Sequence, residues 1–158
     1  MPSCSNMTSK FCKVCGQLES IYHLFATCTV AKQVWQHFLP FFTKLLPDCN
    51  ILIHPHLMLG IFPVSGQPTT NFSRRLAFTL SSTIVHALWV ARVNHRNGDR
   101  KPTFALVKSQ VCSRIRDIIK HKFRIFTNNG TIAEFRQRFA VNDAICSVSL
   151  TKQLYIYI

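Results

Sequence analysis

Four residues near the start of the chain have the types and spacing of a metal site. Cys12, Cys15, His23 and Cys28 form a C-x2-C-x7-H-x4-C pattern within one short segment. Thiolates and imidazoles are the ligands that Zn²⁺ prefers, and four of them close a tetrahedral structural site with no open position. The alternative, ordinary cysteines beside a core histidine, is the weaker interpretation because the pattern starts with C-x2-C. The sequence therefore predicts one structural Zn²⁺.

These ligands need a turn and a helix to bring them together. The C-x2-C spacing is typical of a turn that points two sulfurs at one ion, and a helical turn can deliver the histidine and the last cysteine. From Val30 to Leu39 apolar residues recur at helical intervals. Pro40 is expected to end or bend that helix. His37 lies beside the apolar face, and we interpret it as a partly buried residue rather than a fifth ligand.

Further helices are expected downstream of an irregular, proline-containing connector. A helix capped by Asn71 or Ser73 is predicted to run to about Asn94. A second helix is expected from about Phe104 to Phe126, and a shorter one from Thr131 to Phe139. The chain end, Leu154-Tyr155-Ile156-Tyr157-Ile158, is strand-like. His54 and His56 straddle a proline in the connector, and we interpret them as structural.

The predicted fold is mainly α, with a small zinc-binding module followed by three to four packed helices and an irregular C-terminal tail. Its predicted parts are a CCHC zinc-binding module at 11–39, a connector at 40–70, a basic helical region at 71–139 and a tail of unclear structure at 140–158.

Composition favours a folded, strongly basic protein. The chain has 158 residues, of which 47% are hydrophobic, enough for a real core. Its 19 Lys and Arg against 6 Asp and Glu leave a net charge of +13. Such a charge opposes compaction and favours a polyanionic partner. A solvated basic surface is the alternative.

The basic residues concentrate in the second half of the chain, where cations beside a packed helix face are suited to phosphate contacts. Such contacts give affinity and salt dependence without sequence preference. A zinc module ahead of them favours nucleic acid over a merely solubilising face. The candidate nucleic-acid-binding residues are Arg92, Arg96, Arg100, Lys101, Lys108, Arg114, Arg116, Lys120, Lys122 and Arg124.

Secretion and membrane insertion are not expected. The first ten residues lack the apolar region of a secretory signal, and seven cysteines do not suit a disulfide framework. The apolar stretch from Leu76 to Val93 is interrupted by polar residues and is better explained as a buried amphipathic helix. We expect an intracellular protein without a membrane partner.

The segment from Cys12 to Trp35 resembles the zinc-binding domain at the carboxyl-terminal end of non-LTR retrotransposon reverse transcriptases. The shared features are the ligand set, Gly16 after C-x2-C, Glu19 before the histidine, His23-Leu24-Phe25, and the helix ending in Val34-Trp35. Leu88-Trp89-Val90-Ala91-Arg92-Val93-Asn94 is similar to the family's downstream W-x-A-R-N segment, although Val93 separates the arginine from the asparagine.

This resemblance implies a role in engaging template RNA or target DNA during target-primed reverse transcription. It carries over Cys12, Cys15, His23 and Cys28 as zinc ligands and implies the polymerase part of the same element as a further partner. It also implies a nuclear location. Polymerase activity is not carried over, because the chain has no Y-x-D-D-like motif.

An enzymatic function is not expected. A restriction-like endonuclease, which follows a similar zinc motif in some retroelements, needs carboxylates and a lysine around Mg²⁺. Pro47-Asp48 superficially matches the start of that motif, but no Asp with a trailing Lys follows at a short interval. A cysteine committed to zinc is not a free nucleophile. A zinc-stabilised nucleic-acid-binding module is therefore predicted, and a structural or protein-interaction helical domain with a structural zinc is the alternative.

Overall fold

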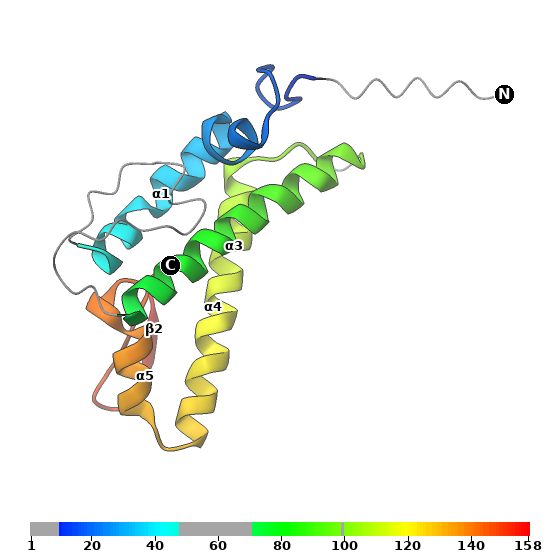
Figure 1. Cartoon of the computed structure of the whole chain (residues 1–158). Helices are drawn as coiled ribbons and strands as arrows, with labels where there is room; N and C mark the ends of the chain where they lie inside the picture. Colours follow the sequence, from blue (N-terminus) through cyan, green and yellow to red (C-terminus); the bar gives the residue numbers. More distant parts are fainter. Residues whose placement is uncertain (1–9, 48–70, 99) are drawn as a thin grey trace.

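The computed structural model describes residues 10–47, 71–98 and 100–158, and over these residues the protein is mainly helical, as predicted (Figure 1). Within these ranges, a short π-helix, η1, leads into four α-helices, a 3-10 turn, η2, and two short strands. The elements are η1 (His23–Thr27), α1 (Thr29–Leu45), α3 (Asn71–Arg96), α4 (Phe104–Asn128), α5 (Ile132–Phe139), η2 (Val141–Asp143), β1 (Cys146–Val148) and β2 (Leu154–Ile156).

Helix α1 continues through Pro40 to Leu45, so of the two predicted effects of this proline, ending or bending the helix, the first is wrong. Proline removes one backbone donor from a helix and crowds the preceding turn. Here Phe38 and Phe42, on either side of Pro40, are both fully buried, whereas Pro40 itself is exposed. Burial of the flanking rings holds the helix on the core, and residues 40–45 belong to α1 rather than to a connector.

Helices α3 and α4 are the longest elements in the described part of the chain, and both pack on α1. The buried face of α3 includes Leu80 and Ile84, and that of α4 includes Val107, Val111 and Ile115. The three helices predicted after the connector are all present, with ends within two residues of those expected. Thr103 caps α4, because its hydroxyl accepts a hydrogen bond from the backbone N–H of Leu106 at 3.2 Å.

Helix α3 also has the length and composition of a membrane-spanning helix. Its most apolar stretch has a mean hydropathy of 1.4, and half of that stretch is buried inside the protein. A core helix meets the same criterion. The absence of a membrane partner therefore stays a prediction.

The end of α4 packs on α5 through a group of aromatic rings, the phenylalanine cluster. Phe135 is fully buried and lies 5.1 Å from Phe123, 5.9 Å from Phe126 and 5.0 Å from Phe139, measured between ring centroids. The first two of these neighbours belong to α4, so the rings join two helices that only a short turn at Gly130 separates. These rings lie where α4 meets α5, and Figure 1 shows this end of α4 far from the blue segment that carries Cys12 and Cys15.

The C-terminal tail contains a small antiparallel sheet. Strand β1 pairs with β2 in the register Cys146↔Ile156 and Val148↔Leu154. The strand character expected near the end of the chain is confirmed for β2, whereas its partner β1 was not predicted. Ile145 and Ile158 are buried, so the tail packs on the helical core.

Candidate metal centre

A tight turn orients the first two cysteines. The backbone N–H of Gly16 donates to the carbonyl of Cys12, and the N–H of Cys12 donates to the carbonyl of Gln17, both at 2.7 Å. Gly16 adopts a φ of +77°, which L side chains rarely tolerate. Phe11 and Leu18 pair as an isolated antiparallel bridge that closes the loop. The predicted turn is therefore present, and the glycine is required by its backbone.

The π-helix η1 carries the histidine to the other side of the site. The N–H of His23 donates to the hydroxyl of Ser20 at 2.9 Å, and the N–H of Cys28 donates to the carbonyl of His23 at 2.8 Å. That i→i+5 bond widens the turn, as in other π-type turns at functional sites. Cys28 is the residue before α1, so the last ligand is fixed by the start of the long helix.

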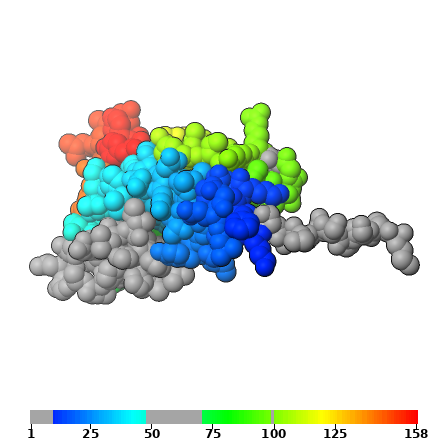
Figure 2. Space-filling view, turned by 90° about the horizontal axis from the view of Figure 1, so that it is seen from above, coloured from blue at the N-terminus to red at the C-terminus, as the bar shows by residue number. Residues whose placement is uncertain are grey.

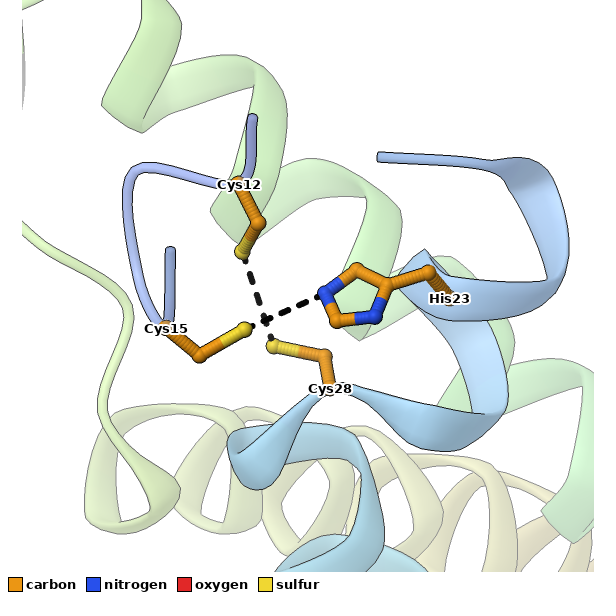
Figure 3. Close-up of side chains that lie close together, drawn as sticks. All are labelled: Cys12, Cys15, His23 and Cys28. Carbon is orange, nitrogen blue, oxygen red and sulfur yellow. Dashed lines mark hydrogen bonds between the residues drawn. The ribbon is translucent and has the colours of Figure 1, made fainter. Parts of the chain in front are cut away.

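The four side chains converge on one point (Figure 3). Their ligand atoms all lie within 4.8 Å of one another, with 3.9 Å between the sulfurs of Cys12 and Cys28 and 3.2 Å between the sulfur of Cys15 and Nε2 of His23. A tetrahedral ion with Zn–S bonds of about 2.3 Å separates two sulfurs by about 3.8 Å. The donor set and its spacing therefore fit one tetrahedrally coordinated ion, and Zn²⁺ is the ion that such ligands prefer.

Burial and hydrogen bonding support this geometry. Cys12, His23 and Cys28 are buried, and Cys15 is half-buried. Nδ1 of His23 lies 3.1 Å from the hydroxyl of Thr27, which leaves Nε2 facing the sulfurs. A partner on the second ring nitrogen is the arrangement that orients a metal-bound histidine. The site can hold one ion, and four protein ligands would leave that ion no open position.

A charged network joins the site to α3. Arg92 is only 6% exposed; its Nη2 donates to the sulfur of Cys12 at 2.7 Å and its Nε donates to Oε1 of Glu19 at 3.2 Å. Arg96 donates to the same carboxylate oxygen at 2.8 Å. Burial alone would raise the pKa of Cys12, but hydrogen bonds from Arg92, His23 and nearby backbone outweigh it and lower the pKa to about 6. Burial raises the pKa of Cys28.

Trp35 ties the segment that holds the four ligands, residues 12–28 (the metal segment), to α1. Its ring is 1% exposed, and its indole N–H donates to the carbonyl of Phe25 at 2.7 Å. Because Phe25 lies between His23 and Cys28, this bond fixes the backbone that carries both ligands. The sequence placed Trp35 on the apolar face of its helix, which its burial confirms, but gave no hydrogen-bond partner for it, and Glu19 entered only as a point of resemblance. Ser20 and Thr27 carried no signal, since hydroxyl residues are common near helix ends.

The structure separates Arg92 from the other predicted nucleic-acid-binding residues. Arg92 is buried beside Cys12, so it does not belong to the exposed basic surface with which it was grouped. Arg96 is exposed but paired with Glu19. Lys108 is half-buried, with its ammonium 5.9 Å from the ring centre of Phe104. The other predicted nucleic-acid-binding residues are all exposed: Arg100, Lys101, Arg114, Arg116, Lys120, Lys122 and Arg124.

Two further cysteines lie in the core, away from the metal centre. Cys112 on α4 and Cys146 on β1 are both buried, which raises the pKa of each thiol, for Cys146 to about 12. They behave as small core residues. His37 is half-buried and packs edge-on against Phe104, and burial lowers its pKa. The histidines at 54 and 56 and the cysteines at 4 and 49 lie outside the described residues.

Comparison with known proteins connects the chain to a transposable element. It is 27% identical over 139 residues to the uncharacterized 149 kDa protein of transposon TX1 from Xenopus laevis. The match covers 87% of this chain but only 10% of that relative. No protein-family model and no solved structure matches the chain. The similarity supports a retrotransposon origin.

Proposed function

We propose that the protein is a zinc-stabilised nucleic-acid-binding module, derived from the carboxyl-terminal region of a retrotransposon reverse transcriptase and without polymerase activity of its own. The similarity to the TX1 protein supports the origin, and the Cys/His cluster supports the metal. Binding to RNA or DNA is the step beyond these findings, and it rests on how the metal centre and the cations are arranged.

The observation that carries the proposal is that the metal centre packs against the start of the cationic helix. Val14, Cys28 and Arg92 share a small cavity with Pro102 and Val107, where α4 begins. Lys101 and Arg100 precede that point and are exposed. Figure 2 shows the metal segment, in blue, next to the light-green segment between α3 and α4. The metal thus fixes one end of the surface along which the cations lie.

Along α4 the cations form an exposed row, which we call the α4 row: Arg116, Lys120 and Arg124. They follow one another at i, i+4, so neighbours are separated by about 6 Å along the helix axis. Ile115 and Ile119, on the same turns, are buried in the core, which directs the row outward. Asp117 is the acidic residue among them. Such a row can contact successive phosphates without reading bases.

The test is fluorescence anisotropy with labelled single-stranded RNA, single-stranded DNA and duplex DNA of matched length. The logarithm of the affinity should fall linearly with the logarithm of the salt concentration. Arg116→Gln, Lys120→Gln and Arg124→Gln together should reduce that slope by about one for each phosphate-binding cation that is replaced. The control triple, Lys32→Gln, Lys44→Gln, Lys152→Gln, removes the same charge from exposed positions on α1 and the tail.

Two results would count against the proposal. Equal weakening by both triples would show that net charge rather than the α4 row drives binding. Absence of binding to all three nucleic acids at low salt would remove nucleic acid as the partner. The preferred probe among the three would identify template-like RNA or target-like DNA.

A second function, protein docking, is favoured by exposed apolar side chains around the metal segment. Leu18 is 63% exposed and Ile21 is 82% exposed, and Phe11 and Tyr22 are about half exposed. We propose the polymerase part of the same element as the occupant. Leu18→Ser with Ile21→Ser should abolish capture of separately expressed polymerase region while leaving zinc content unchanged; unchanged capture would exclude this surface.

A further inference from the structure

The guanidinium of Arg92 meets the metal centre from a helix distant in sequence. It is buried on α3 and donates to the Cys12 sulfur at 2.7 Å. A buried cation is costly unless it is paired and hydrogen-bonded. Its two partners are a metal-ligating sulfur and the carboxylate of Glu19, which is itself 15% exposed. Arg92 is therefore placed as part of the metal centre's surroundings rather than as a surface cation.

The contact between Arg92 and Cys12 can balance the charge of the metal site. A Zn²⁺ held by three thiolates and a neutral imidazole carries a net charge of −1. One guanidinium cancels that charge inside a buried site, where an uncompensated charge is disfavoured. A charge-assisted hydrogen bond to sulfur also withdraws electron density from the thiolate. The neighbouring Glu19 in turn is balanced by Arg96, so the network closes without a stranded charge.

The same network links two parts of the chain mechanically. Glu19 lies between Cys15 and His23 in the metal segment, and it binds Arg92 and Arg96 one helical turn apart on α3. Arg96 is the last residue of α3, directly before the turn that leads to the cations of α4. Glu19 thereby ties the metal segment to the last turn of α3.

We propose that Arg92 is a positioning residue for the metal centre, which supplies its counter-charge, donates to the Cys12 thiolate and docks the metal segment on α3. This inference rests on the zinc site of the proposed function. It concerns neither nucleic-acid binding nor the α4 row, so it stands or falls separately from them.

The test compares Arg92→Met with wild type by zinc affinity, measured by chelator competition, and by the absorption of the Co²⁺-substituted protein. Loss of an outer hydrogen-bond partner should weaken metal binding about 10–100-fold. The thiolate-to-cobalt charge-transfer band should move to longer wavelength, because a sulfur without its donor is more electron-rich. Loss of packing alone would not move that band.

Matched variants separate the roles. Arg92→Lys keeps the charge and should recover part of the affinity; it also serves if the methionine variant does not fold. Glu19→Gln should weaken affinity but leave the cobalt band in place, because the donor to sulfur remains. The control is Arg114→Met, which removes an exposed cation from α4 and should bind zinc within about twofold of wild type, below the loss expected for an outer partner.

The outcomes are decisive in each direction. Wild-type zinc affinity and an unshifted cobalt band in Arg92→Met would overturn the role of Arg92 and leave the zinc-stabilised module intact. A wild-type protein that binds no stoichiometric zinc would overturn both the inference and the metal part of the proposed function.

Discussion

Replacing Trp35 with phenylalanine should destabilise the protein in a way that the second tryptophan does not reproduce. The indole is buried, and its N–H donates to the Phe25 carbonyl inside the metal segment. Removing the donor from this part-buried carbonyl costs about 1–3 kcal/mol. The smaller ring removes packed atoms and costs about 1 kcal/mol more. The expected loss is therefore about 2–4 kcal/mol of unfolding free energy, or roughly 4–16 °C in Tm.

The assay is urea unfolding followed by circular dichroism at a fixed excess of zinc, together with zinc affinity. The Trp35→Phe variant should also bind zinc more weakly, because the bond holds the backbone between His23 and Cys28. The control is Trp89→Phe on α3, where the ring is 51% exposed; a surface change should cost no more than about 0.5 kcal/mol. Equal effects of the two substitutions would refute the reasoning, as would a Trp35→Phe variant within about 0.5 kcal/mol of wild type.

Three further predictions follow from the same structure. Stripping the metal with a chelator should release one zinc per chain and expose the three cluster cysteines to alkylation, while Cys112 and Cys146 stay protected until global unfolding; peptide mass spectrometry distinguishes the two sets. Pro40→Ala should raise stability by up to about 3 kcal/mol, because Pro40 is exposed inside α1 and a proline there costs a helix bond; a lower urea midpoint would contradict this. Thr103→Ala should lower stability by about 1 kcal/mol through loss of the α4 cap, whereas Thr103→Ser should be close to wild type in the same unfolding assay.

The metal ligands could be predicted from sequence because the information is local. A C-x2-C turn and a histidine five residues before a cysteine bring their side chains together through short backbone segments, and the structure places all four ligand atoms in one group. The long helices could also be predicted from the sequence, because their apolar residues repeat at the helical period. The buried faces of α3 and α4 confirm that period.

Arg92 could not be assigned from sequence, for a physical reason. Its charge and its place in a run of basic residues indicated a surface cation. Its burial depends on Cys12 and Glu19, which reach it from the far end of the chain. Pairing of β1 with β2 was hidden in the same way, because strand partners are set by tertiary packing that a three-residue segment does not encode. Pro40 shows the reverse: a strong local signal was overridden by burial of the rings around it.

The phenylalanine cluster is a second set of contacts that holds the helices together, and it does not depend on the metal. Helices α3 and α4 meet the metal segment at one end, through Arg92 and Pro102, and α5 at the other, where Phe126 packs on Phe135. Native-state hydrogen exchange should therefore resolve two cooperative units. Chelation should speed exchange of amides at the metal end of both helices and leave those near α5 protected. Loss of zinc would then cause reversible local unfolding at one end of α3 and α4, while the rest of the protein stays folded.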